Sequence, residues 1–109
     1  MKQDTQEKLS QLQNIEQNIN SIIAQKQQFQ TQDIEVDNAL SQLKDSKKVF
    51  RIIGNIMVES SNTETKKELE EKKEVISLRL KTLDKQEEKL RDRAQVLQQE
   101  VMKEMNKDG

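Results

Sequence analysis

The residues that could perform chemistry are few in kind. The 109-residue chain has no histidine and no cysteine, which removes the commonest general base, the thiolate nucleophile and the usual zinc ligands. Its only glycines are Gly54 and Gly109, so it cannot form a glycine-rich phosphate-binding loop. Carboxylates are plentiful, but lysines and arginines are interspersed with them along the chain. We therefore expect no enzyme activity, no catalytic residue, no metal ion and no cofactor.

One short segment suggests binding instead of catalysis. Residues 49–60 read VFRIIGNIMVES, in which Gly54-Asn55 stands between β-branched residues. This pattern predicts a β-hairpin with a two-residue primed turn, because glycine tolerates the positive φ required at the first central position. The predicted register pairs Ile53 with Ile56, Ile52 with Met57, Arg51 with Val58 and Phe50 with Glu59.

Both faces of this predicted ribbon carry apolar side chains, and a two-stranded ribbon alone is marginally stable at best. Full burial of its seven apolar side chains would contribute on the order of 10 to 20 kcal/mol as an upper bound. Only partner subunits offer that much cover, so we interpret the hairpin as an oligomerisation element. The alternative is a hairpin that only caps its own helices. The predicted assembly residues are Val49, Phe50, Ile52, Ile53, Gly54, Asn55, Ile56, Met57 and Val58.

Helical heptads occupy the chain on both sides of the hairpin. Apolar residues recur in alternating steps of three and four, which is typical of a coiled-coil seam. Lys26 and Asp33 interrupt the first seam and could set its register. The first seam comprises positions 12, 15, 19, 22, 26, 29, 33, 36, 40 and 43, and the second comprises positions 69, 73, 76, 80, 83, 87, 90, 94, 97 and 101.

These patterns predict a mainly α fold: one long antiparallel coiled-coil hairpin with a β-hairpin at its turn. We expect a single domain over residues 1–109, with helices at about 5–46 and 63–105 around a β-hairpin at about 49–60. Ser61-Asn62-Thr63-Glu64 has the form of a capping box, and Thr65 to Glu68 offers a second choice one turn later, so the second helix is expected to begin near these residues.

Charge and hydropathy restrict the partners. The 19 basic and 20 acidic residues give a formal charge of -1, so neither nucleic acid nor anionic lipid is expected to bind. No apolar run approaches the ~20 residues needed to cross a bilayer. We expect a cytoplasmic protein with no membrane or nucleic-acid partner.

The hairpin and the second helix resemble those of the β-type subunit of prefoldin, especially its archaeal form. The resemblance rests on VFRIIGNIMV at residues 49–58 and on KELEEKKEVISLRLKTLDKQEEKL at residues 67–90. A single hairpin, instead of two, is similar to the β-type and not the α-type subunit. The family often has tyrosine at the position of Phe50.

The resemblance implies an ATP-independent chaperone. It implies a hexamer of two α-type and four β-type subunits, whose hairpins assemble into β-barrels from which coiled coils project. The projecting tips would hold unfolded polypeptides and deliver them to a group II chaperonin. In this chain the tips would be the two termini, and the expected client-binding residues are Leu9, Leu12, Ile15, Val101, Met102 and Met105.

A second hypothesis is a structural coiled-coil scaffold or tether that oligomerises through its hairpin. It predicts one fixed stoichiometric partner and no binding to assorted unfolded proteins. Methionine adapts to varied apolar surfaces, which favours the chaperone.

Overall fold

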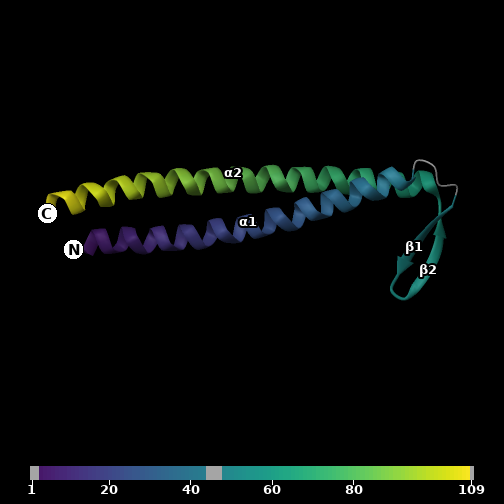
Figure 1. The fold of residues 1–109 in the computed structure, drawn as a ribbon, viewed down its shortest axis with the longest axis horizontal. Coiled ribbons are helices and arrows are strands. Elements are labelled where there is room, and N and C mark those ends of the chain that lie inside the picture. Colours follow the sequence, from purple (N-terminus) through teal and green to yellow (C-terminus); the bar gives the residue numbers. More distant parts are fainter. Residues whose placement is uncertain (1–2, 44–47, 109) are drawn as a thin grey trace. The chain divides into compact units, whose positions relative to one another are not determined.

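The chain consists of two long helices with one β-hairpin between them in the sequence. The computed structural model describes residues 3–43 and 48–108, and its elements follow the order α1 (Gln3–Leu43), β1 (Val49–Ile53), β2 (Ile56–Ser60) and α2 (Asn62–Asp108) (Figure 1). This confirms the predicted fold class of two helices joined through one antiparallel hairpin. The assembly of hairpins into barrels stays a prediction.

The helix bounds differ from the predicted ones by a few residues. α1 begins at Gln3 instead of residue 5, and the predicted end of this helix at residue 46 lies outside the described residues. α2 extends to Asp108, three residues beyond the prediction. Asp4 in the first turn of α1 and Lys107 in the last turn of α2 carry the charges that favour helix termini.

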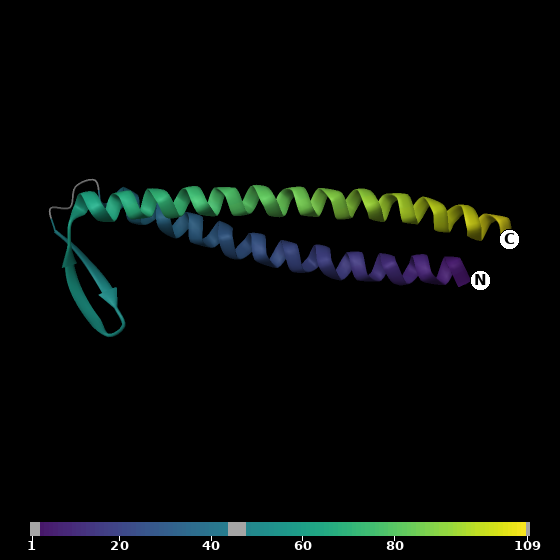
Figure 2. The same ribbon diagram turned by 180° about the vertical axis from the view of Figure 1, so that it is seen from behind.

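The chain forms two compact units, which we describe separately. The terminal unit combines Met1–Gln27 with Lys81–Gly109, and the hairpin unit is Gln28–Leu80. In the terminal unit the start of α1 lies beside the end of α2 in both views (Figure 1, Figure 2). The single-domain assignment for residues 1–109 stays a prediction.

The seam predicted from the heptads is the core of both units. Every one of its twenty positions is buried or half-buried. The buried apolar side chains of the terminal unit are Ile15, Ile22, Leu83, Leu97 and Val101, and those of the hairpin unit are Val36, Leu43 and Ile76. Packing of these two stripes, more than intrinsic helix propensity, therefore holds the helices together.

The hairpin has the predicted register. β1 and β2 are antiparallel, with Ile53 opposite Ile56 and Ile52 opposite Met57. Gly54 has a φ of 61°, whereas Asn55 has no positive φ, as in a type II′ turn. Gly54 therefore occupies the turn position that needs a positive φ, which residues with a Cβ rarely adopt.

Within this unit, polar contacts connect the hairpin to α2 and connect α2 to α1. The Ser61 Oγ accepts a hydrogen bond from the Glu64 amide at 3.3 Å, which is the N-cap that the S-x-x-E sequence predicted. The Asn62 side-chain amide donates a hydrogen bond to the Leu43 carbonyl at 2.8 Å, and Leu43 is in the last turn of α1, where carbonyls need partners outside the helix. Arg51 of β1 pairs with Glu68 of α2 at 2.9 Å. These contacts fix the point at which the ribbon joins α2.

Candidate functional site

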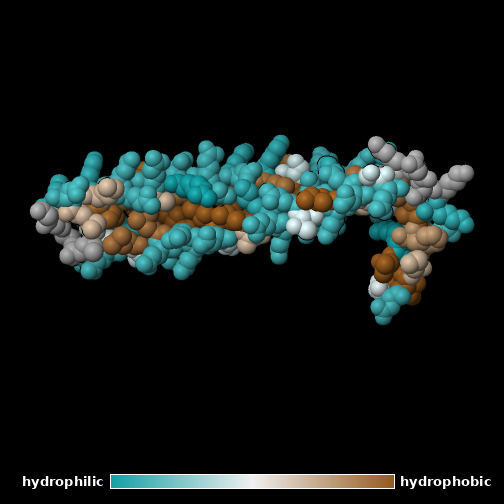
Figure 3. Space-filling model, in the orientation of Figure 1, coloured by the Kyte–Doolittle hydropathy of each residue, from teal (hydrophilic) through white to brown (hydrophobic). Residues whose placement is uncertain are grey.

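The hairpin presents an apolar surface that its own chain leaves uncovered. Ile52 is 73% exposed and Ile53 is 61% exposed. The visible face of the hairpin is mostly brown and beige in the hydropathy view, with teal at its tip (Figure 3). Val49 is half-buried, and the other predicted assembly residues are exposed, namely Phe50, Ile52, Ile53, Gly54, Asn55, Ile56, Met57 and Val58.

This exposure is large for a monomeric surface. Single exposed apolar residues are common on soluble proteins, but contiguous apolar patches on an element of this size mark interaction sites. The outer edges of β1 and β2 also carry backbone groups that no strand of this chain pairs, since the sheet contains only these two strands among the described residues. The hairpin can therefore bind other chains both through its side chains and through its edges.

The predicted client-binding residues meet at one end of the terminal unit, but their exposure differs. Ile15 and Val101 are buried in the seam, and Leu9 and Leu12 are half-buried. Met102 is 64% exposed and Met105 is 52% exposed. With the helices paired, a client would contact the two methionines directly and reach the buried pair only if the helix ends separate.

A groove runs between the helices on the flank that the methionines occupy. It has a volume of ≈ 490 Å³. On α2, Gln95 and Gln98 line it, and steps of four and three from Gln98 lead to Met102 and Met105 on the same helix face. A brown band follows the line between the helices on the visible face of this unit (Figure 3). The groove is lined by Leu12, Ile15, Glu16, Ile19, Asn20, Ile23, Arg91, Ala94, Gln95 and Gln98.

Beyond the apolar seam, a polar cluster links the first turns of α1 to the last turns of α2. Thr5 is only 1% exposed, and its hydroxyl donates a hydrogen bond to Glu104. Lys8 pairs with Glu104 at 2.6 Å and with Glu100 at 3.4 Å. The hydrogen bond to Glu104 raises the pKa of Lys8 above its ordinary value. Sequence reasoning missed this cluster, although continuing the heptad outward reaches positions 5, 8 and 104.

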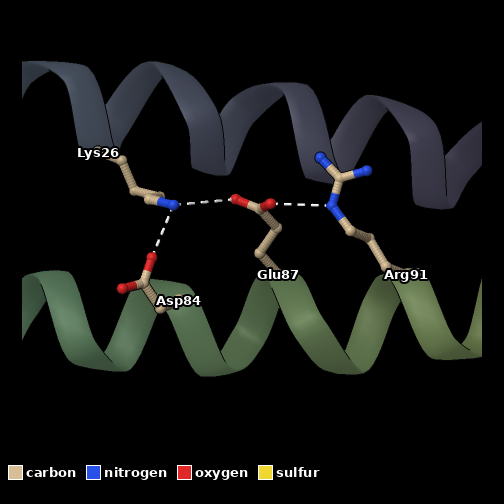
Figure 4. A network of polar contacts seen from close by, with 4 residues as sticks. All are labelled: Lys26, Asp84, Glu87 and Arg91. Carbon is tan, nitrogen blue, oxygen red and sulfur yellow. Dashed lines mark hydrogen bonds and ion pairs between the residues drawn. The ribbon is translucent and has the colours of Figure 1, made fainter.

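Charged residues also occupy one layer inside the seam. Lys26 lies between Asp84, 2.6 Å away, and Glu87, 3.2 Å away, and Arg91 contacts the second oxygen of Glu87 at 2.8 Å (Figure 4). Both Lys26 and Glu87 are heptad positions, so two breaks in the apolar pattern face each other. Any slip of one helix would place one of these charges against an apolar side chain, and the layer therefore favours this register.

Reversing the charges of this layer one at a time should destabilise the terminal unit. Lys26→Glu places a third carboxylate near Asp84 and Glu87, so we expect a lower midpoint of thermal unfolding, followed by circular dichroism. The double variant Lys26→Glu/Glu87→Lys should recover only part of the loss, because the new carboxylate still faces Asp84 and the new amine still faces Arg91. Equal midpoints for all three proteins would show that the layer does not set the register.

The same layer predicts how stability depends on pH. The hydrogen bond from Arg91, and then that from Lys26, holds the pKa of Glu87 below its ordinary value of 4.5. A carboxylate with a lowered pKa stabilises the fold above its ordinary pKa, and the contribution disappears as pH falls through the folded value. The unfolding midpoint should therefore drop on acidification below 4.5. Glu87→Gln should reduce this acid-dependent drop, and an unchanged profile would contradict the assignment.

Bonds to Asp84 and Glu87 raise the pKa of Lys26 above 10.5. The stabilisation from this lysine is complete below 10.5 and should be lost as pH rises through the folded value.

The described residues contain neither a group of side chains that could hold a metal ion nor a helix that could cross a membrane. Within residues 3–43 and 48–108, no group of acidic side chains is arranged to hold a metal ion. Neither α1 nor α2, as far as the structure describes them, contains a stretch apolar enough to span a bilayer.

Comparison with known proteins decides the family. The family model described as prefoldin subunit matches residues 3–108. The chain belongs to the prefoldin subunit family. It is 38% identical to prefoldin subunit beta of Archaeoglobus fulgidus over 96 residues, which cover 85% of this chain and 83% of that protein. It is 32% identical to prefoldin subunit beta of Methanococcoides burtonii over 107 residues, with coverages of 95% and 92%.

A solved prefoldin structure has the same fold. The crystal structure of the prefoldin beta subunit from Thermococcus strain KS-1 superposes with a TM-score of 0.87 at 27% sequence identity, covering 94% of this chain and 92% of that one. The resemblance inferred from the hairpin and the second helix is thereby confirmed. The roles of individual hairpin and tip residues stay predictions.

Proposed function

We propose that this prefoldin chain is the β-type subunit of an ATP-independent chaperone that assembles through its hairpin and holds unfolded polypeptides at its helix ends. The observation that carries the proposal is the exposed apolar hairpin on a chain of this family. A ribbon with two apolar faces and two open edges requires partner chains, as a subunit does.

The proposed assembly is a hexamer of two α-type and four β-type subunits, with the hairpins forming β-barrels. Each subunit would then contribute one pair of helix ends to a shared client-binding region. Several weak apolar contacts in one assembly bind a flexible client more tightly than one contact does, since later contacts form at high effective concentration. We propose delivery of the client to a group II chaperonin, in the cytoplasm, with no catalytic step by this chain.

Client capture is proposed to use the groove and the two methionines beside it. Met102 and Met105 are exposed, flexible and apolar, and methionine adapts to many partner surfaces. The groove extends this surface inward along the seam over Leu12, Ile15 and Ile19. Such a surface selects for apolar content and not for a particular sequence, which suits unfolded chains.

The proposal is tested by aggregation of a denatured client protein diluted into buffer with the assembled complex. We expect light scattering from the aggregating client to fall in proportion to added complex, equally with and without ATP. A complex whose β-type chains lack residues 1–12 and 98–109 should assemble but protect poorly. Full protection by the truncated complex, or an ATP requirement, would contradict the proposal. Binding of one fixed partner and of no unfolded protein would favour the scaffold hypothesis.

A further inference from the structure

The apolar seam of the terminal unit stops before its helices do. Val101 is the last buried apolar residue of α2, although this helix continues to Asp108. Leu9 and Leu12 are the first large apolar residues of α1, and both are half-buried. Between these residues and the described helix ends, no buried apolar side chain joins α1 to α2. Other contacts must therefore hold the ends together.

Polar contacts occupy the seam at these ends. The hydroxyl of the buried Thr5 donates a hydrogen bond to the Glu104 carboxylate. Lys8 contacts Glu104 at 2.6 Å and Glu100 at 3.4 Å. The side chains of Lys8 and Glu104 are 26% and 25% exposed, so water weakens their attraction. The ends are thus held less firmly than the apolar seam, and local opening of the helix pair should begin there.

Separation of these ends would uncover apolar side chains on both helices. The paired ends present Met102 and Met105, and separation would add Val101 of α2 with Leu9 and Leu12 of α1. Exposure of these side chains to water is unfavourable, but an unfolded client could cover them with its own apolar residues. Separated ends would therefore bind a client more tightly than paired ends.

We propose that the contacts among Thr5, Lys8 and Glu104 form a clasp that keeps the helix ends paired and so limits client capture. The inference rests on the proposed function at the helix ends and adds a closed and an open state to it. Because the open state binds a client more tightly, the apparent affinity falls with the fraction of ends that are closed. Closure without a client also hides apolar surface through which tips could associate with one another.

Lys8→Glu tests the clasp in the assembled complex. The substitution places a carboxylate against Glu100 and Glu104, so repulsion replaces attraction while no apolar surface is added. The matched control is Lys103→Glu, which makes the same change of charge at an exposed position near the same end of α2. By fluorescence anisotropy, we expect a labelled unfolded protein to bind the Lys8→Glu complex about tenfold more tightly, and the control complex as tightly as the unsubstituted one.

A reversible lock tests the closed state. The chain has no cysteine, so Thr5→Cys/Glu104→Cys gives it two thiols, which a short bis-thiosulfonate reagent joins and a reducing agent releases. The joined form cannot open, whereas the released form lacks the clasp. We expect the joined form to bind the labelled client about tenfold more weakly than the same complex after reduction. Hydrogen exchange of the backbone amides in residues 3–12 and 98–108 should be faster in the released form, with or without a client.

Three results would overturn the clasp. Equal hydrogen exchange in Lys8→Glu and Lys103→Glu would show that these contacts do not hold the ends together. Equal client affinity of the joined and released forms would show that paired ends capture clients fully. Faster exchange in Lys8→Glu without tighter client binding would show that open ends gain nothing for capture. If the unsubstituted complex bound no unfolded protein at all, the proposed function itself would be rejected, and the role of the clasp in capture with it.

Discussion

Replacing Ile53 with aspartate will leave the chain folded but abolish its assembly with other subunits. Ile53 is largely exposed in the single chain, so the substitution removes little from the fold. In the proposed assembly the same position lies in an apolar interface, where a carboxylate would have no partner. An uncompensated buried charge costs roughly 3 to 5 kcal/mol, and ~4 kcal/mol is about a thousandfold in affinity for each interface.

The matched control for this experiment is Ile34→Asp. Ile34 and Ile53 have the same exposed fraction, 61%, and lie in the same unit, but Ile34 is on the outer face of α1 and not on the hairpin. We expect light scattering to show the full complex for Ile34→Asp and only small species for Ile53→Asp, with equal helix content by circular dichroism. Normal assembly of Ile53→Asp would show that this hairpin face is not an interface.

Replacing Met102 and Met105 with serine should weaken client capture without affecting assembly. Full burial of one methionine contributes roughly 1.5 to 3 kcal/mol, so partial burial of two under a client contributes a similar amount. Loss of ~1.4 kcal/mol is a tenfold loss of affinity at each tip, and the effect grows when several tips hold one client. Both methionines are exposed, so the helix pair itself should keep its unfolding midpoint.

Val96→Ser provides the control for the methionine variant. Val96 is also exposed and lies near the same end of α2, but it is on the flank opposite the groove. We expect client binding, followed by fluorescence anisotropy of a labelled unfolded protein, to be about tenfold weaker for the methionine variant and unchanged for Val96→Ser. Equal losses in the two variants would mean that the tips bind through any exposed apolar residue.

Much of the fold could be predicted because local rules and packing agree in this chain. The Gly54-Asn55 pair sets the turn and thereby the register of every residue in the ribbon. The heptads identify all twenty seam positions, since only one face of each helix can meet the other helix. Even the polar breaks at Lys26 and Glu87 are explained once the antiparallel pairing sets them opposite each other.

The candidate site was less predictable because apolar residue type does not reveal whether a side chain faces the seam or solvent. Ile15 and Val101 look as suited to client binding as Met102 in the sequence, yet they are buried and Met102 is exposed. The Thr5 and Glu104 contact joins residues from opposite ends of the chain. Extending the heptads outward reaches both positions, but apolar periodicity does not predict a polar pair there. Val75 and Leu78 point outward from α2, which becomes apparent only when the seam is known.

The central claim is that this prefoldin chain is an assembly subunit that uses its hairpin to join other subunits. The most direct test is the mass in solution, by light scattering, of the chain alone and mixed with an α-type prefoldin subunit from the same source. The account predicts a discrete complex with the mass of two α-type and four β-type chains. Two unmixed species, with this chain no larger than a dimer, would contradict it.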